Sequence, residues 1–407
     1  MSLPSNPTAP AAPRRFGLPI IQSFSYYIAF IGLGLSSAVF GPALTQLSAH
    51  TQVSLSAIST IFIANALGRT IGSFFGGRLY DRLPGHPVLA SAFVCIAVAH
   101  VLLPTSNALW LLLALMFLLG LAEGTVDVGC NTLIIQVHGT NVGPYMNALH
   151  FTFGLGAFLI PPIVALSINN TGDVNGAFWF IALVSVPLII WFARLRSPAM
   201  RTAQHAASPT SARNNLGVLA LFAVFFFFFV GVETEFGSWT FNFGKGFALT
   251  ETNAALLSST YFGGFTIGRL ISIPLAAHIR PRTFLILDVV GMLIGVGMLI
   301  VATQAGSELS ALLWIAIFVI GLAVASCFPV ALSFAEERLQ VTGKVAGLFL
   351  ATSNIGVMFF PWLVGQFFES RGPASLTYIS AATIVSATIL FVLIVIAMRR
   401  ARPPVAV

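Results

Sequence analysis

Residues 108–136 read ALWLLLALMFLLGLAEGTVDVGCNTLIIQ, a run whose only charged side chains are Glu123 and Asp127. A helix needs about 20 apolar residues to cross the hydrocarbon core of a bilayer, so this stretch is long enough to span a membrane. The whole chain has the same character, since 57% of its 407 residues are hydrophobic and only 8% are charged. A typical soluble domain has roughly 25% charged residues. The sequence therefore predicts a helical integral membrane protein.

Apolar runs of this kind recur twelve times, as six runs, a polar connector and six more. They cover residues 18–47, 55–77, 87–104, 108–136, 145–168, 176–194, 216–242, 253–277, 283–303, 309–335, 345–368 and 375–398. The connector, 195–215, is rich in Pro, Ser and Ala and separates a first domain, 18–194, from a second, 216–398. Residues 1–17 and 399–407 are predicted tails. The expected fold is all-α, with 12 transmembrane helices in two six-helix bundles.

Basic residues lie mostly on the side of the predicted bundle that both termini share. Fifteen of the 19 Lys and Arg residues are on that side, and two, Lys245 and Arg371, are on the other. Because cytoplasmic loops carry an excess of Lys and Arg, both termini are predicted to be cytoplasmic, in a plasma membrane or a bacterial inner membrane. Topology then accounts for the positive charge, and no nucleic-acid partner is expected. The bundle is predicted to work in the lipid bilayer as a monomer.

The two halves of the chain match each other at an offset of 200 residues. The corresponding positions are Leu67-Gly68-Arg69 with Ile267-Gly268-Arg269, Arg82 with Arg282, Gly156 with Gly356, and Pro161 with Pro361. Such parallel six-helix repeats resemble the construction of the major facilitator transporters. In those proteins the substrate site lies between the halves near the midplane, and one half rocks against the other. The resemblance implies pseudo-symmetric bundles with a central site.

The turn between the second and third runs, Gly77-Arg78-Leu79-Tyr80-Asp81-Arg82, resembles the cytoplasmic gate motif of that superfamily. In the motif a Gly is followed four residues later by Asp and Arg, and its basic tail is replaced here by Leu83-Pro84-Gly85-His86. The resemblance implies a gate at Gly77, Asp81 and Arg82, in which the two charged residues join the loop to helix ends in the outward-open state. An ordinary charged turn is the alternative.

Three segments resemble the fucose:proton symporter branch of the superfamily and the related glucose transporter-like proteins. The residues that carry this resemblance are Asp127 and Asn131 in the fourth run, Asn147, His150, Gly154 and Gly156 in the fifth, and Gly231, Glu233, Gly237 and Trp239 in the seventh. The resemblance implies a sugar substrate and a coupled proton. The chain departs from the fucose permease in its first run, which has no acidic residue.

Acidic residues inside the predicted helices are costly to insert into a membrane, so each one is a candidate for function. Glu123, Asp127 and Asn131 are four residues apart, which keeps them within about 80° of one helical face. A carboxyl group in a low dielectric favours its neutral form, so Asp127 or Glu123 could load a proton on one side and release it on the other. Substrate binding or a structural pairing with Arg69 is the alternative for Asp127, and a structural role is equally open for Glu123.

The seventh run carries two acids, Glu233 and Glu235, which cannot share one helical face because positions two apart diverge by about 200°. We assign Glu233 to the cavity as a third candidate for proton coupling, since the resemblance includes it. Trp239 and Asn242 follow at roughly helical spacing and are predicted to bind substrate. Trp239 would stack on a sugar ring, and an interfacial anchor is the alternative.

Further substrate contacts are predicted at Asn131, Asn147, Asn354 and His150. Amide side chains both donate and accept hydrogen bonds, which suits a polyhydroxylated solute. Interhelical hydrogen bonding is the alternative and is favoured for Asn147, which lies near the end of a run. His150 is equally suited to substrate binding, to a proton relay or to a bond between helices.

Arg69 and Arg269 occupy equivalent places in the two halves, and each follows a Gly. A repeated position favours an architectural role, so we predict that both form charge pairs inside the membrane. Binding of a substrate carboxylate is the alternative, and it would make the substrate anionic.

These features predict a secondary active transporter that moves a small polar solute, a sugar by the resemblance, by alternating access coupled to a proton. Sodium is left open as the coupled ion. A proton-coupled exporter of drugs or metabolites could use the same acids and is the alternative. No cofactor, metal or enzymatic activity is expected, because the chain has no P-loop and its three cysteines lie in separate apolar runs.

Overall fold

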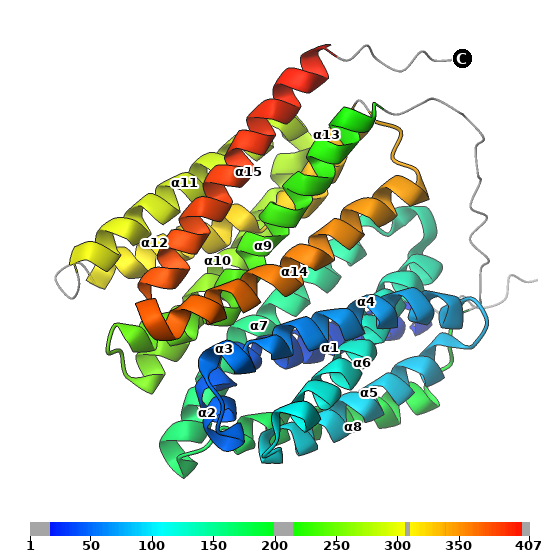
Figure 1. Ribbon diagram of the computed structural model, residues 1–407. Helices are drawn as coiled ribbons and strands as arrows, with labels where there is room; N and C mark the ends of the chain where they lie inside the picture. The colour runs from blue at the N-terminus through cyan, green and yellow to red at the C-terminus, as the bar shows by residue number, and fades with distance from the viewer. Residues whose placement is uncertain (1–16, 199–214, 306–309, 338, 401–407) are drawn as a thin grey trace, which may run out of the picture.

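A computed structural model describes residues 17–198, 215–305, 310–337 and 339–400. Nearly all of the predicted tails, 1–17 and 399–407, and most of the predicted linker, 195–215, lie outside the described residues. Every long element of the described residues is an α-helix (Figure 1).

The helices divide at the connector into two groups. The first group holds α1 (Leu18–Ala38), α2 (Phe40–Thr51), α3 (Leu55–Ile58), α4 (Thr60–Tyr80), α5 (Gly85–Leu102), α6 (Leu109–His138), α7 (Gly143–Thr171) and α8 (Asn175–Arg194). The second holds α9 (Leu216–Gly246), α10 (Glu251–His278), α11 (Pro281–Ala305), α12 (Ser310–Val324), α13 (Cys327–Glu336), α14 (Gly343–Arg371) and α15 (Ala374–Arg400). Short 3₁₀ turns at Leu103–Thr105 and Gly139–Asn141 follow α5 and α6.

Three of the predicted runs are each divided between two helices, and proline explains two of these breaks. Proline has no N–H to donate, and its ring crowds the carbonyl group four residues earlier. Pro42 therefore disfavours a continuous helix through Ala38, where α1 ends, and Pro329 has the same effect at Ala325, between α12 and α13. The second run is divided at Ser59, between α3 and α4.

Within the described residues, eleven helical segments are long and apolar enough to cross a membrane. The remaining predicted run, 253–277, corresponds to α10, a helix of 28 residues that packs against α7, α9 and α12. The chain is therefore a multi-pass membrane protein, and the predicted all-α membrane fold is confirmed.

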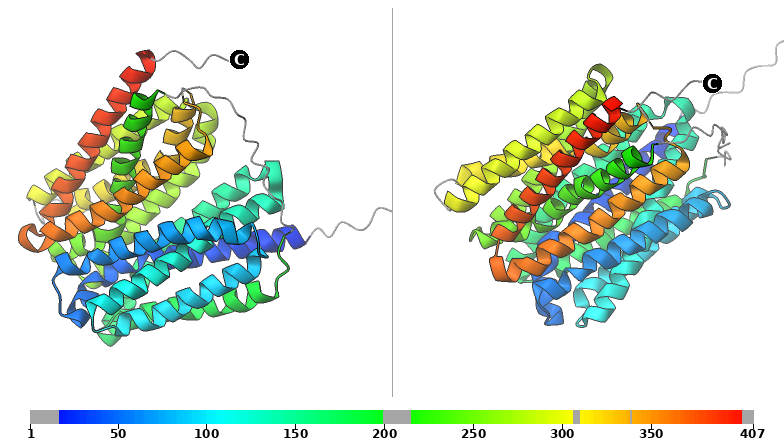
Figure 2. Two further views of the ribbon diagram at one scale, coloured as in Figure 1. Left: turned by 45° about the vertical axis from the view of Figure 1, so that its right-hand side comes forward. Right: turned by 45° about the horizontal axis from the view of Figure 1, so that its top comes forward.

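The pairing of helices is similar in the two groups. In the first group α4 packs on α6 and α1 on α7, and in the second α10 packs on α12 and α9 on α14. The two groups lie close together at one side of the molecule and diverge toward the other (Figures 1 and 2). We name the side with the start of α1 and the end of α15 the terminal side, and the opposite side the far side.

Glycines allow the backbones of paired helices to touch. A Cβ atom built on Gly68 of α4 would overlap the carbonyl oxygen of Phe117, and one on Gly120 of α6 would overlap that of Asn65. In the second group, Gly321 of α12 faces the carbonyl oxygen of Tyr261 in the same way. Small residues permit this close approach in membranes, so the repeated glycines fix how the paired helices cross.

Candidate functional site

A cavity of about 290 Å³ lies between the two groups, roughly midway along their helices. Its polar lining consists of Ser37, Asn65, Arg69, Ser73 and Asp127 from the first group and Glu233, Thr234, Ser238, Tyr261 and Asn354 from the second. The volume is near the lower end of the roughly 300–1,000 Å³ typical of small-molecule sites. Its size and its lining from both groups suit a small polar solute.

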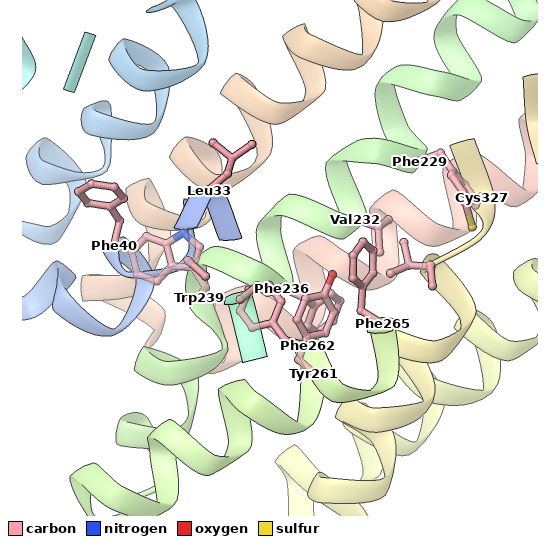
Figure 3. Close-up of a cluster of buried hydrophobic side chains, with 14 of the residues drawn as sticks. Leu33, Phe40, Phe229, Val232, Phe236, Trp239, Tyr261, Phe262, Phe265 and Cys327 are labelled. Atoms are coloured by element: carbon pink, nitrogen blue, oxygen red, sulfur yellow. The ribbon is translucent and has the colours of Figure 1, made fainter. Parts of the chain in front are cut away.

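Aromatic side chains form the wall of the cavity on the second group. Figure 3 shows Phe236, Tyr261, Phe262 and Phe265 packed beside one another, and the last three also line the cavity. The hydroxyl group of Tyr261 donates a hydrogen bond to the backbone carbonyl of Glu233 at 2.7 Å. This bond ties α10 to α9 at the place where Glu233 meets the cavity.

Asp127 is the acid that the first group presents to the cavity. The amide nitrogen of Asn131 donates to the Oδ1 atom of Asp127 at 3.0 Å and to its backbone carbonyl at 2.9 Å. Arg69 and Arg269 both act on Asp127 electrostatically, but Arg69 and Arg269 each lie closer to another carboxylate. Asp127 is thus a cavity carboxylate held by an amide, with two guanidinium groups near it.

Glu233 is the acid that the second group presents to the cavity. Its Oε1 atom lies 4.0 Å from Nη2 of Arg269, and the two side chains are 30% and 25% exposed. The Arg269 guanidinium lies 4.3 Å from the centre of the Phe265 ring, within the range of a cation–π contact. Glu235, two residues later, is fully buried and does not line the cavity.

Glu123 is buried inside the first group and does not line the cavity. Its Oε2 atom accepts a hydrogen bond from the amide nitrogen of Asn65 at 3.0 Å and lies 3.8 Å from Nη1 of Arg69. Arg69 also donates to the hydroxyl of Ser37 at 3.1 Å. Arg69 and Arg269 therefore each lie within 4.0 Å of a glutamic acid side chain, although the partners come from helices that the repeat does not relate.

The predicted substrate-binding residues are dispersed in the structure. Asn354 lines the cavity, and Asn131 reaches it only through its bond to Asp127. His150 is half-buried with its ring edge-on to Phe30, at 5.7 Å between ring centres. Asn147 is exposed near the start of α7. The structure brings only Asn354 of these four to the cavity wall, and the substrate role of the others stays a prediction.

Trp239 and Asn242 pack between helices in this state. The indole N–H of Trp239 donates to the carbonyl oxygen of Pro361 at 2.8 Å, and the ring is fully buried. The Asn242 amide donates to the carbonyl of Gly41 at 2.8 Å and accepts from the hydroxyl of Thr45 at 2.7 Å. Neither residue lines the cavity, so in this state the structure gives each a contact between helices, and their contact with substrate stays a prediction.

The predicted gate residues lie on the terminal side, at the end of α4. Asp81 and Arg82 are both exposed, and a Cβ atom built on Gly77 would meet nothing within 4 Å. Within the described part of the chain, neither charged side chain has a hydrogen-bond or ion-pair partner. The resemblance implies contacts in the outward-open state, so their role stays a prediction.

Hydrogen bonds close the far side of the molecule across the two groups. Besides the bonds of Asn242, the Gln366 amide donates to the carbonyl of Ser56 at 3.0 Å, and a carboxylate oxygen of Glu369 accepts from the backbone N–H of Leu55 at 2.6 Å. The two groups diverge toward the terminal side (Figure 2). The structure therefore shows a state that is closed on the far side.

Removing this closure should favour a state that is open on the far side. We expect the double variant Asn242→Ala/Gln366→Ala to shift the balance of the two states roughly tenfold or more, because each lost hydrogen bond contributes about 0.5–1.5 kcal/mol. Spin labels at cysteines substituted for Asn107 and Gln304, exposed on the far side of each group, would report a longer distance. Ser370→Ala is the control, since among the described residues Ser370 bonds only to its own helix, at Phe367. Unchanged distances in the double variant would contradict the assignment.

Comparison with protein families decides the class of the chain. The profile of the Major Facilitator Superfamily matches residues 26–361 and 247–406. The chain belongs to the major facilitator superfamily. It is accordingly a membrane transporter and not an enzyme, as the sequence predicted.

Relatives of known name are similar over most of the chain. Sodium-dependent glucose transporter 1A of Mus musculus is 32% identical over 376 residues, which cover 83% of this chain and 88% of that protein. Sodium-dependent glucose transporter 1 of Homo sapiens is 30% identical and covers 83% and 71% of the two chains. The resemblance to glucose transporter-like proteins is thereby confirmed.

Solved structures share the fold at low sequence identity. The crystal structure of a D-xylose-proton symporter superposes with a TM-score of 0.76 at 16% identity, over 95% of this chain and 98% of that one. A mutant of the nucleoside transporter NupG superposes with a TM-score of 0.75 at 15% identity, over 94% and 99%. These structures support the major facilitator fold of the transporter.

Several cavity residues of this transporter were missed in the sequence. Ser37, Asn65, Thr234, Ser238 and Tyr261 line the cavity, but none carries a charge, and Thr234 and Ser238 stand at the variable positions of the motif in the seventh run. One signal was present for Asn65, which precedes Arg69 by four residues and so shares its helical face. The hydroxyl-bearing residues gave no comparable signal, because Ser and Thr are common in membrane helices.

Proposed function

We propose that this protein carries a hexose or a similar small polyhydroxylated solute across the membrane, driven by a cation that binds at Asp127. The observation that carries the proposal is the pair of acids in one cavity, Asp127 from the first group and Glu233 from the second. Amide, hydroxyl and aromatic side chains surround them, which is the lining that a sugar requires. The printed names of the relatives, which are glucose transporters, support the same substrate class.

Asp127 is the acid best placed to exchange a cation with the cavity. Glu233 has Arg269 at 4.0 Å, and Glu123 is shielded from the cavity and has Arg69 at 3.8 Å. Asp127 faces the cavity, and within the described part of the chain its one hydrogen-bond donor is the neutral amide of Asn131. Neutralisation of Asp127 by a cation would change the charge of the surface that both groups share, and so could alter how they approach each other.

Two cations are candidates, and a different observation favours each. The names of the relatives favour sodium. The surroundings of Asp127 favour a proton, because its neighbours are N–H donors and guanidinium groups and not the ring of oxygen atoms that a metal cation prefers. We retain the proton, which the sequence also predicted, in the proposal.

The proposal also includes the orientation and domains of the protein. The excess of basic residues on the terminal side supports a cytoplasmic location of both ends. The structure would then be open toward the cytoplasm. The two units that move against each other would be residues 18–194 and 216–398, each a six-span bundle.

Uptake of labelled hexoses into proteoliposomes tests the proposal. A proton gradient and a sodium gradient are applied separately, to the intact protein and to Asp127→Asn. We expect the proton gradient to drive accumulation of the sugar. One charge moving through 100 mV could sustain a sugar concentration ratio of roughly fifty-fold. In Asp127→Asn accumulation should be lost while sugar exchange without a gradient is retained.

The matched control is Asp173→Asn, at an acid that pairs with His50 on the far side at 3.3 Å and lies outside the cavity. It should accumulate sugar as the intact protein does. Accumulation driven only by sodium would contradict coupling to a proton and would leave the proposed sugar substrate unaffected. An absence of sugar flux under either gradient, with proton-driven export of other solutes, would favour the exporter.

A further inference from the structure

A buried histidine outside the cavity is linked to Glu123 through a single hydroxyl group. The Ser36 Oγ atom of α1 lies 2.6 Å from Oε1 of Glu123 on α6 and 3.3 Å from Nε2 of His100 on α5. All three side chains are completely buried. They belong to three different helices of the first group, so their contact depends on its tertiary packing.

The second ring nitrogen of His100 determines where its hydrogen sits. Nδ1 lies 2.9 Å from the carbonyl oxygen of Ile96, one turn earlier on α5. A carbonyl oxygen can only accept, so Nδ1 must carry a hydrogen. When the ring is neutral, Nε2 then has a lone pair and can only accept a hydrogen bond from Ser36.

Ser36 has one hydroxyl hydrogen for two neighbours. If it donates to His100, Glu123 must carry a proton in order to donate to Ser36. If it donates to an ionised Glu123, Nε2 of His100 must be protonated in order to donate to Ser36. In both arrangements every hydrogen bond is formed. Both contain one proton more than an ionised Glu123 together with a neutral His100. Without that proton two lone pairs would face each other in a dry interior, which is costly.

Comparison with His86, on the same helix, shows that the additional proton is required because of the carboxyl group of Glu123. Its Nδ1 atom lies 3.0 Å from the carbonyl oxygen of Leu195, and its Nε2 atom lies 2.8 Å from the hydroxyl of Tyr26. Tyr26 can donate to His86 without any other partner. A neutral His86 therefore has a complete set of hydrogen bonds, and no additional proton is required.

We propose that Glu123, Ser36 and His100 form a buried proton-binding unit, separate from Asp127, and that its proton resides on Glu123 in this state. A proton on His100 would bury a second cation in the same interior as Arg69. The charged group that faces the unit from α4 is Arg69, beside the neutral Asn65. The rings of Phe178 on α8 and Phe40 on α2 face His100, at 5.8 and 6.3 Å between ring centres.

The unit can act on the cavity through Arg69. The Nη1 atom of Arg69 is 3.8 Å from Glu123, beyond hydrogen-bonding distance, and 3.1 Å from Ser37, while Arg69 also lines the cavity. A neutral Glu123 leaves this guanidinium available to Asp127, whereas an ionised Glu123 attracts it inward. The effect on transport rests on the function proposed above, but the presence of the proton does not.

Infrared difference spectroscopy of the purified protein tests for the proton directly, because a protonated carboxyl group and a carboxylate absorb in different regions. We expect the intact protein to show, near neutral pH, a protonated-carboxyl band that is absent from Glu123→Gln. In Ser36→Ala the band should move to higher frequency, since the carboxyl O–H loses its acceptor. In His100→Leu the hydroxyl of Ser36 becomes free to donate to an ionised Glu123, so the protonated-carboxyl band should weaken.

The control is His86→Leu, an equally drastic change on the same helix, which should leave the Glu123 band unchanged. Identical spectra in the protonated-carboxyl region, with a carboxylate band lost in Glu123→Gln, would overturn the proposal, because Glu123 would then be ionised. So would an unaltered band in both Ser36→Ala and His100→Leu. Sugar uptake is measured on the same preparations. If the Glu123 band is present but the protein transports no sugar, the proposed function is wrong and the proton site at Glu123 still stands.

Discussion

Gly120→Val should prevent the first group of helices from assembling. A Cβ atom at this position would overlap the carbonyl oxygen of Asn65 and crowd the backbone nitrogen of Arg69 at 3.0 Å. Backbone atoms cannot move aside as a flexible side chain can, so α4 and α6 would have to separate. Overpacking typically costs about 1–3 kcal/mol and more where the structure cannot relax. We therefore expect at least a roughly tenfold fall in the yield of monodisperse protein, measured by size-exclusion chromatography.

Gly297→Val is the control for this experiment. Gly297 lies in the middle of α11, and a Cβ atom there would meet nothing within 4 Å. The same substitution should leave the yield nearly unchanged. Comparable losses in both variants would show that β-branching in a membrane helix, and not the crossing of α4 and α6, causes the defect.

Arg269→Gln should abolish transport and destabilise the protein. The change leaves Glu233 without its cation in a cavity between membrane helices. Removal of one partner from a fully buried pair costs about 3–5 kcal/mol. The two side chains here are 25% and 30% exposed, so we expect a smaller loss of stability, about 2 kcal/mol. Unfolding of the purified protein on heating measures this loss, and sugar uptake should fall roughly hundredfold because the cavity charge is changed.

A second substitution separates the structural effect from the functional one. Glu233→Gln/Arg269→Gln removes the unpaired charge, so much of the stability lost in Arg269→Gln should return. Uptake should stay low, because the double variant removes Glu233, the acid that the second group presents to the cavity opposite Asp127. Full recovery of uptake in the double variant would show that the pair is only structural. A single variant as stable as the intact protein would show that the pair contributes nothing.

Charged residues inside the helices could be identified as functional candidates from the sequence, because inserting a charged side chain into a membrane costs free energy. Asp127, Glu233 and Arg69 were all singled out on that ground, and all three line the cavity. The same reasoning could not separate Glu123 from Asp127, which are one turn apart on α6. Only Asp127 faces the second group, whereas Glu123 points into its own bundle, where Ser36 and Asn65 surround it.

Contacts between distant segments could not be predicted from the sequence. Trp239 and Asn242 were expected to contact substrate, on helical spacing and a motif. The structure places both between helices, because Pro361 and Gly41 supply carbonyl acceptors that lie far away in the sequence. Helical spacing fixes which residues share a face, but it does not fix which helix covers that face.

The sequence by itself determined that this chain is a membrane protein with two repeated halves. Length and hydrophobicity of each run suffice for this, since an apolar helix in a bilayer satisfies its own backbone hydrogen bonds. Tertiary structure alone decided which polar groups meet. The cavity between Asp127 and Glu233 and the proton unit of Glu123, Ser36 and His100 arise where helices cross. Those crossings depend on close backbone contacts at glycines such as Gly120. The sequence shows where these glycines are, but it does not show which helix each of them contacts.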